Sequence, residues 1–395
     1  MRAMIGTKYP SEKREYVDEK TGVKITQLTS NYINNHMYFT DNSFDVNRNE
    51  IYFLSNRANP EKEECNLFHM DLETGEMTQL TDEPEGIIAG CLTKTPDSKY
   101  FAYFSGNDLH LYCTETGENK VIYTEKTMVA RGPSFSADRQ WIGFTRNEDI
   151  ANLPNREENY SGFKERLYGI KDARISMVRI DGTDFHDVYR DTHQLGHFQF
   201  SPDDNDIAMF CHEGPWNRVL QRIWIMNVKT REIWHCFRQA ENDCVGHEFW
   251  LQNGDLLFDN RMGGHDGTIT SNKEQLDELE HESTDTPWFG IAGKDGEVYR
   301  KFDMPFYCNH YHSNPDATLF VGDALEDIVL IKVTPDGEAK AKSLAVHNTT
   351  WRFQRSHCHP TFSWDGTKIL YAADTDRWHD NIFLVDLNDL TDEQW

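Results

Sequence analysis

The chain has 395 residues, 12% of them aromatic, so it can bury a large core and is not a disordered segment. A formal net charge of −26 argues against nucleic acid and anionic membrane surfaces as partners. No apolar run approaches membrane-spanning length, and the N-terminal stretch MRAMIGTKYPSEKREYVDEK has no signal-peptide core. The eight cysteines are scattered without a CxxC pair, which predicts reduced thiols and a cytoplasmic protein.

From the N-terminus onward, a turn followed by a short β-rich run recurs along the chain. The turn carries Pro, Asp, Asn or Gly, and the run is rich in Ile, Phe, Tyr and Val, as hairpin strands are. The seven copies are DVNRNEIYFL (45–54), TPDSKYFAYF (95–104), SADRQWIGFT (136–145), SPDDNDIAMF (201–210), LQNGDLLFDN (251–260), NPDATLFVGD (314–323) and SWDGTKILYA (363–372).

Each copy is followed by a strand, a polar turn and another strand. These second segments begin at residues 66, 108, 174, 222, 288, 328 and 381. The seventh, NIFLVDLNDLTDEQW, stops before its final strand. The N-terminal stretch REYVDEKTGVKITQLT (14–29) has the Gly turn and the QLT ending of the first of these segments, GEMTQLT. It therefore supplies the strand that the last unit lacks.

Seven four-stranded units, spaced about 40 to 65 residues apart, predict an all-β fold, a seven-bladed β-propeller whose last blade is closed by the N-terminal strand. A pair of β-sandwiches is the alternative, but it explains neither the regular repeat nor the split last unit. We expect a single domain over residues 1–395, with polar insertions at about 147–173 and 262–287.

Histidines recur at the start of the innermost strands, which line the central channel of a propeller. A single histidine at a strand start is usually a satisfied polar residue. Here five of the seven units carry one at a similar distance before the turn motif, which indicates one shared site. The histidines are His36, His197, His247, the pair His310 and His312, and the pair His357 and His359.

The two histidine pairs suggest a metal site. Alternate residues of a strand face the same side, so His357 and His359 can converge on one point, and so can His310 and His312. Imidazoles with the amide oxygen of Gln354 nearby suit Mn²⁺, Zn²⁺, Co²⁺ or Ni²⁺. The absence of a cysteine thiolate argues against a closed structural zinc site.

Between these histidines lies FCHEGPWNRVLQRIWIMN (210–227), in which a GPW turn separates His212 from Arg222. Arg222 can be a partner in a surface salt bridge or a guanidinium fork for a ligand carboxylate. The sequence by itself favours the salt bridge.

Five motifs, taken together, point to a family. They are LGHFQFSPDD (195–204), CHEGPWNRVLQRIW (211–224), GHEFW (246–250), HYHSNPDATLFVGD (310–323) and QRSHCHPTFSWDG (354–366). In this order and at these blade positions they resemble the oligogalacturonate lyase family, seven-bladed propeller enzymes of pectin degradation. The likeness covers most of the chain. A weaker likeness to the propeller domain of TolB concerns the fold only.

The resemblance implies a Mn²⁺ ion held by three histidines and one glutamine, a histidine base and an essential arginine. Other histidines around the channel are candidate contacts to the sugar. The residues are His310, Gln354, His357 and His359 for the metal, His247 and Arg222 for catalysis, and His36, His197 and His212 for substrate binding.

Three features depart from the family pattern. His312 stands where an apolar residue is expected, so either histidine of HYH is a candidate ligand. The insertion at 262–287 is longer than usual, and the stretch after VGD is shorter. Loops of this kind decide which sugar fits, so a related uronide is an alternative to digalacturonate.

The expected activity is metal-dependent β-elimination on a small acidic oligosaccharide. A base removes the C5 proton, which is α to the carboxylate, and the C4 oxygen leaves with the next sugar. A divalent ion on the carboxylate stabilises the negative charge that develops. The alternatives are a non-catalytic, TolB-like propeller that binds a protein or peptide, and a metal-dependent hydrolase.

Overall fold

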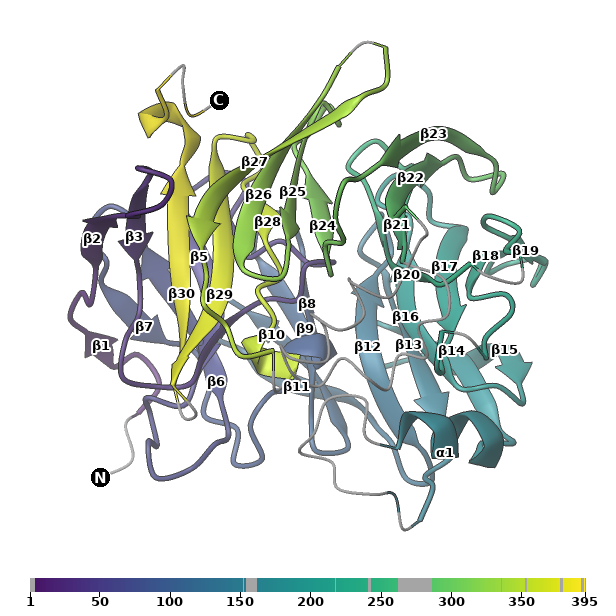
Figure 1. Cartoon of the computed structure of the whole chain (residues 1–395). Helices are drawn as coiled ribbons and strands as arrows, with labels where there is room; N and C mark the ends of the chain where they lie inside the picture. Colours follow the sequence, from purple (N-terminus) through teal and green to yellow (C-terminus); the bar gives the residue numbers. More distant parts are fainter. Residues whose placement is uncertain are drawn as a thin grey trace.

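A computed structural model describes residues 4–394 except 152, 154–161, 217, 241–242, 262–285, 335, 352–353, 377–378 and 392–393. The described residues form seven antiparallel sheets that follow one another along the chain (Figure 1). This arrangement confirms the predicted all-β fold, a seven-bladed β-propeller.

The first four blades run in sequence order, each from its innermost strand outward. Blade 1 has β4 (Asn34–His36), β5 (Glu50–Ser55), β6 (Asn66–Asp71) and β7 (Met77–Gln79), with β1 (Lys8–Tyr9) on its outer edge. Blade 2 has β8 (Leu92–Lys94), β9 (Tyr100–Ser105), β10 (Asp108–Cys113) and β11 (Asn119–Thr124). Blade 3 has β12 (Val129–Phe135), β13 (Trp141–Asn147), β14 (Ala173–Arg179) and β15 (His186–Asp191). Blade 4 has β16 (Leu195–Phe200), β17 (Ile207–His212), β18 (Ile223–Asn227) and β19 (Ile233–His235).

The last three blades complete the ring. Blade 5 has β20 (Val245–Trp250), β21 (Leu256–Asn260), β22 (Trp288–Ala292) and β23 (Val298–Asp303). Blade 6 has β24 (Tyr311–Ser313), β25 (Leu319–Asp323), β26 (Asp327–Val333) and β27 (Ala339–Val346). Blade 7 has β28 (Thr361–Phe362), β29 (Lys368–Asp376) and β30 (His379–Asp386), continued by β3 (Lys24–Gln27) and β2 (Arg14–Val17).

The N-terminus closes blade 7, as predicted, but it contributes two strands instead of one. β3 pairs antiparallel with β30, with Thr26 opposite Leu384, and β2 adds outside β3. Beyond the strand, the Leu28 N–H donates to the Ile382 carbonyl at 2.8 Å. Figure 1 shows the N-terminal strands β2 and β3, in purple, beside the C-terminal strand β30, in yellow.

The apolar core lies between neighbouring blades. At the closure, Phe53 and Phe68 of blade 1 pack with Leu370 and Ile382 of blade 7, and all four are fully buried. Truncating one such side chain to Ala typically costs about 2–5 kcal/mol. Packing of this kind, together with the β3–β30 hydrogen bonds, holds the ring closed.

Short helices lie in the connections: α1 (Phe163–Gly169), and the 3-10 turns η1 (Ala89–Cys91), η2 (Gln354–Ser356) and η3 (Leu387–Asp389). The helix α1 falls within the predicted insertion at 147–173, of which residues 152 and 154–161 lie outside the described part. Of the predicted insertion at 262–287, only residues 286–287 are described.

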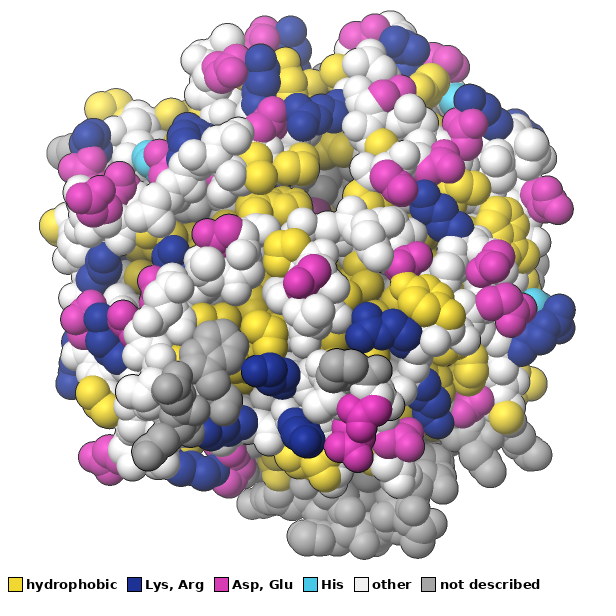
Figure 2. Space-filling model, turned by 90° about the horizontal axis from the view of Figure 1, so that it is seen from above, with side chains coloured by type: hydrophobic (Ala, Val, Ile, Leu, Met, Phe, Trp, Pro, Cys, Tyr) yellow, Lys and Arg dark blue, Asp and Glu magenta, His cyan; other side chains and the backbone are white. Residues whose placement is uncertain are grey.

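Acidic and basic side chains are interspersed over the face seen from above (Figure 2). The net charge of −26 is therefore not gathered into one patch on this face. Among the described residues, no helix has the length and apolar character needed to cross a membrane.

Candidate metal centre and catalytic cavity

Three buried histidines from blades 6 and 7 face one another. His310, His357 and His359 each offer a ring nitrogen, and these atoms all lie within 4.8 Å of one another. The ring centroids of His310 and His359 are 4.3 Å apart, and that of His357 is 5.5 Å from His310. The three imidazoles, called the metal-type trio below, thus surround one point, as metal ligands do.

Local backbone geometry brings these side chains together. His357 and His359 lie in the loop between η2 and β28 and not on a strand, so strand alternation is not the reason that they converge. His359 instead has a left-handed backbone, with φ of +46°. Non-glycine residues rarely adopt this conformation, and it is concentrated at functional sites.

In two of the three rings, one nitrogen is held by a residue that is not one of the three histidines. Nδ1 of His310 lies 2.8 Å from Oδ2 of Asp323, and Nδ1 of His357 lies 3.2 Å from the amide nitrogen of Asn309. Nε2 of His310 and Nε2 of His359 are buried and make no hydrogen bond to a described residue. A histidine ligand held through its other nitrogen by a carboxylate is a common arrangement around protein metals.

The protonation state also fits a metal. Burial, with some contribution from Arg261, lowers the pKa of His357 to about 3. Burial and the neighbouring histidines, His359 first, lower the pKa of His310 well below its usual value. Metal ions bind neutral imidazole, so burial prepares these rings for a divalent transition metal ion.

The remaining candidates for the metal site are Gln354 and His312. The backbone of Gln354 opens η2, but its side chain is outside the described part, so its role as a ligand stays a prediction. His312 does not join the trio. Its Nδ1 accepts the Phe362 N–H at 3.3 Å, and its ring stacks on Phe249 with centroids 5.2 Å apart. The expected convergence of His310 and His312 is therefore wrong, because His310 precedes β24 and is not part of the strand.

His247 lies beside the metal-type trio, with its ring centroid 4.4 Å from that of His310. Nη2 of Arg261 is 3.1 Å from Nε2 of His247, and Oδ1 of Asp259 is 3.3 Å from Nδ1. Burial first, and then the positive charge of Arg261, holds the pKa of His247 well below its usual value. His247 is therefore a neutral imidazole, the form that can accept a proton.

Sequence reasoning missed Arg261, which directly follows β21 and stands at the edge of the long insertion. Its guanidinium carbon lies 3.8 Å from the ring centroid of Trp216, and Nη2 donates to Oδ1 of Asn309 at 3.0 Å. Gly246 pairs with Asp259 in blade 5, so the end of β21 lies beside His247. The strand register of this hairpin is the feature that could have pointed to Arg261.

Arg222 is not a surface residue but is almost fully buried, and its donors are directed at two carboxylates. Its side chain is 4% exposed, and it donates from Nε to Glu248 at 3.1 Å and from Nη1 to Glu213 at 3.3 Å. The ring of His197 bridges the same two carboxylates, 3.1 Å from Glu248 and 3.4 Å from Glu213. The four side chains form one buried ionic network, and both glutamates were missed by the sequence analysis.

Two other predicted histidines lie in different surroundings. Nε2 of His36 is 3.1 Å from the Cys358 carbonyl, and its ring centroid is 6.4 Å from that of His359, so it borders the metal-type trio. His212 instead ends β17, with Nε2 3.1 Å from Asp191. It is not among the described residues that line the central cavity, because its side chain points into the outer part of the blade against Trp224.

A repeated bulge explains why so many side chains reach the channel. In β16 and β20 the pairing with the next strand shifts, and the bulged residues His197 and His247 have φ of +47° and +49°. In β12 the equivalent bulge contains Gly132, with φ of +61°. A bulge redirects the side chain of one residue, and bulges are frequent next to active sites.

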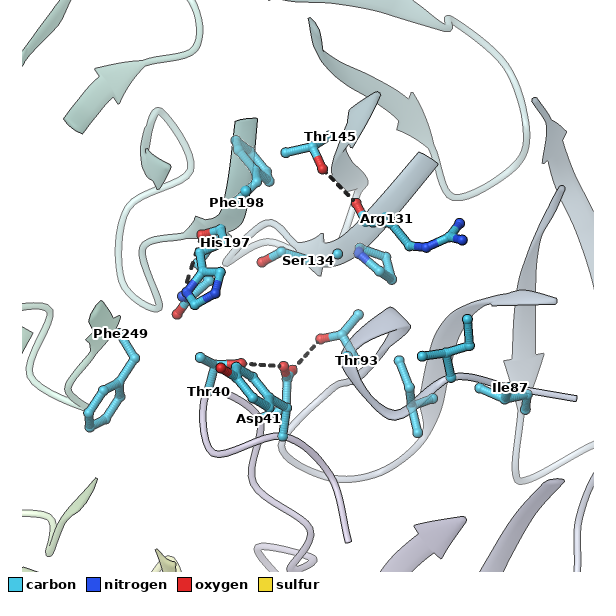
Figure 3. A pocket seen from close by; sticks show the side chains of 18 of the residues that line it. Thr40, Asp41, Ile87, Thr93, Arg131, Ser134, Thr145, His197, Phe198 and Phe249 are labelled. Atoms are coloured by element: carbon cyan, nitrogen blue, oxygen red, sulfur yellow. Dashed lines mark hydrogen bonds between the residues drawn. The ribbon is translucent and has the colours of Figure 1, made fainter. Parts of the chain in front are cut away.

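These groups share one cavity of about 1480 Å³ in the channel, which His197, Arg222, His247 and His359 all line. Figure 3 shows part of it, with His197 and Phe249 at one end and Thr40, Asp41 and Thr93 along one wall. The candidate base, part of the ionic network and His359 of the metal-type trio therefore line a single space.

Comparison with known proteins gives consistent matches. Residues 4–276 match the family model described as oligogalacturonate lyase. The chain is 24% identical to the oligogalacturonide lyase of Pectobacterium atrosepticum and 23% identical to the oligogalacturonate lyase of Dickeya dadantii, each match covering 94% of this chain and 95% of the relative.

Two solved structures have the same fold. One is an oligogalacturonate lyase in complex with manganese, with a TM-score of 0.83 and 22% identity over the whole of both chains. The other is an oligogalacturonate lyase from Vibrio parahaemolyticus, with a TM-score of 0.82, 22% identity, and coverage of 99% of this chain and 100% of that chain.

Proposed function

The chain belongs to the oligogalacturonate lyase family, and on that premise we propose that it cleaves short oligogalacturonides by β-elimination with a bound Mn²⁺ ion. The observation that carries the proposal is the 4.4 Å separation between the rings of His247 and His310. It puts a neutral base next to three histidines that fit a metal. The names of the relatives and the manganese in a structural neighbour support the substrate and the ion.

His310, His357 and His359 hold the ion in this proposal, with Gln354 as the fourth ligand. When bound, Mn²⁺ supplies a Lewis acid that neutralises the uronate carboxylate and makes the proton α to it more acidic. Asp323 holds Nδ1 of His310 and leaves Nε2 as the nitrogen for the ion.

His247 takes the C5 proton in this proposal. Its pKa is held low by burial and by Arg261, so its imidazole is available as a base at neutral pH. Arg261 is itself held over Trp216, and in this proposal it acts through His247. Arg261 is therefore a positioning residue in this proposal.

In this proposal Arg222 is not a clamp for the substrate carboxylate, which was the alternative to a salt bridge that the sequence left open. Its donors are directed at Glu213 and Glu248, so its role is to keep the His197 network in place on the cavity wall. His36 and His197 remain the proposed sugar contacts, whereas His212 does not line the cavity and is not retained.

The remaining expectations concern the whole chain. We propose that residues 1–395 form one domain, because the core clusters join neighbouring blades and one of them crosses the closure. A cytoplasmic location is supported by the eight cysteines, all of them buried and none in a disulfide among the described residues.

Product analysis tests the proposed function. The purified protein is incubated with Mn²⁺ and di- or trigalacturonate, and the products are followed by ultraviolet absorbance and mass spectrometry. β-Elimination gives an unsaturated uronate that absorbs, with no water added. Products that contain one added water indicate a hydrolase. Intact galacturonides and glucuronides rule out the lyase and leave a binding propeller.

A further inference from the structure

The cavity extends well beyond the metal-type trio. Its volume of about 1480 Å³ exceeds the roughly 300–1,000 Å³ of most small-ligand pockets. In Figure 3, His197 and Phe249 lie at one end of the pocket drawn, and Arg131 and Ile87 lie toward the other, with Ser134 between. A ligand that reaches His247 therefore has room for a second ring toward blade 3.

Arg131 is the basic side chain in that direction. It belongs to β12, the innermost strand of blade 3, and is partly exposed in the cavity wall. Its Nη1 donates to the carbonyl of its neighbour Ala130 at 2.7 Å, and it forms no ion pair with any described carboxylate. Its guanidinium therefore keeps donors for a ligand.

Two other arginines of the cavity are paired with carboxylates, and Lys94 is buried against a backbone carbonyl. Arg139 binds Asp97 at 2.7 Å, and Nε of Arg355 lies 3.0 Å from Asp380. Lys94 donates to the Phe44 carbonyl at 2.9 Å. In a chain with a net charge of −26, an anionic ligand needs a local cation that is not already paired, and Arg131 meets this condition.

The backbone next to Arg131 is open as well. Gly132 occupies the bulge position at which β16 and β20 carry His197 and His247. A Cβ built on Gly132 would meet no atom within 4 Å. Blade 3 therefore leaves space at the place where blades 4 and 5 put a ring into the channel.

Asp41, on the wall opposite Arg131 in Figure 3, is one of several acidic residues that line the cavity, and its charge repels an anion there. Its two oxygens accept the hydroxyls of Thr93 at 2.6 Å and Thr40 at 3.0 Å. Burial raises the pKa of Asp41 to about 6, which weakens its negative charge in slightly acid conditions. The hydroxyls and burial thus reduce, but do not abolish, this repulsion.

From these features we infer that Arg131 binds the carboxylate of a second uronate ring, the ring that departs from the one attacked by His247. This subsite rests on the proposed function and deepens it, because it selects diuronates over disaccharides whose departing ring is neutral. A guanidinium and a carboxylate form charge-assisted, often bidentate hydrogen bonds.

The test compares two substrates and three variants. The substrates are digalacturonate and a disaccharide with the same reacting galacturonate but a neutral galactose as the departing ring. The variants are Arg131→Gln, Arg131→Lys and, as the matched control, Arg139→Gln, which removes another cavity-lining arginine that is paired with Asp97.

Arg131→Gln is expected to lower kcat/KM for digalacturonate by about 10- to 100-fold and to leave the neutral analogue unchanged. Arg131→Lys should recover part of the loss, and Arg139→Gln should keep the wild-type preference. An equal loss on both substrates, or a preserved preference in Arg131→Gln, overturns the subsite.

Calorimetric binding of digalacturonate separates this inference from the lyase proposal. If no elimination is detected but Arg131→Gln weakens binding about 10-fold or more relative to Arg139→Gln, the subsite stands and the lyase proposal fails. If elimination occurs but binding and selectivity do not depend on Arg131, the lyase proposal stands and the subsite is wrong.

Discussion

Nδ1 of His310 and Oδ2 of Asp323 lie 2.8 Å apart in a pair whose side chains are both fully buried. The carboxylate also accepts the backbone N–H of His310 through Oδ1. Both contacts hold the Nδ1 side of His310, so Nε2 is the ring nitrogen left for a metal ion. The pair therefore orients a metal ligand from outside the metal site.

Asp323→Asn should weaken metal binding by about 10- to 100-fold without unfolding the protein, because the ring of His310 loses its carboxylate partner. Competition with a chromophoric chelator measures the affinity. Asp316→Asn, in a turn of the same blade where Asp316 accepts the Thr318 hydroxyl, should bind metal as the wild type does. Unchanged affinity in Asp323→Asn would show that the pair does not position the ligand.

His247→Asn should lower kcat by about 100- to 10,000-fold and leave metal content unchanged, because it removes the proposed base and spares the metal ligands. Asn is the suitable replacement, since it tolerates the left-handed backbone that His247 has at φ of +49°. His212→Asn, outside the cavity lining, should keep normal turnover. Loss of metal together with activity in His247→Asn would instead make His247 part of the metal site.

His197 should hold its proton to a higher pH than an ordinary histidine, because its pKa is raised. Burial lowers the pKa of His197, but the carboxylates of Glu248 and then Glu213 outweigh it and raise the pKa, against an opposing effect of Arg222. Glu248→Gln should therefore lower the pKa of His197, as measured by NMR titration of its ring. Equal pKa values of His197 in Glu248→Gln and in the wild type would show that Glu248 does not set this pKa.

The same network should make the free energy of unfolding decrease both at high pH and at low pH. The pKa of His197 is raised in the folded state. Its contribution to the free energy of unfolding is therefore complete below the unfolded-state pKa of about 6.5 and is lost as pH rises through the folded-state pKa. Arg222 and His197 outweigh burial and depress the pKa of Glu248, so its contribution is complete above about 4.3 and is lost as pH falls. The stability advantage of wild type over Glu248→Gln should be largest between these limits.

Arg222→Met should lower the free energy of unfolding by about 3–5 kcal/mol, because it leaves Glu213 and Glu248 buried without their main cation. Adding Glu248→Gln should recover part of the loss, since it removes one uncompensated charge. Urea denaturation followed by tryptophan fluorescence measures both. A variant that is as stable as wild type but inactive would mean that Arg222 contacts the substrate instead.

The fold could be predicted from sequence because every blade repeats the same turn chemistry, and because residues 14–29 carry the segment that blade 7 lacks. The strand β1 could not be predicted, since it is two residues long and pairs with β7 only after blade 1 has formed. Short edge strands of this kind depend on their tertiary partner and leave almost no periodic signal.

The site was harder to predict than the fold. Histidine spacing located His357 and His359, but their convergence depends on a left-handed residue that spacing does not reveal. Arg261 and Asp259 reach His247 through strand pairing within blade 5. His212 was predicted as a sugar contact, whereas its side chain at the end of β17 packs against Trp224 and is not among the described residues that line the cavity.

The central claim is that divalent metal at His310, His357 and His359 is required for β-elimination near His247. Its most direct test is to strip metal from the protein with a chelator, remove the chelator, and titrate Mn²⁺ back while recording ultraviolet absorbance with digalacturonate. The account predicts no absorbance change in the stripped protein and full recovery at about one Mn²⁺ per chain, the stoichiometry of one three-histidine site. Undiminished elimination by the fully stripped protein would contradict it.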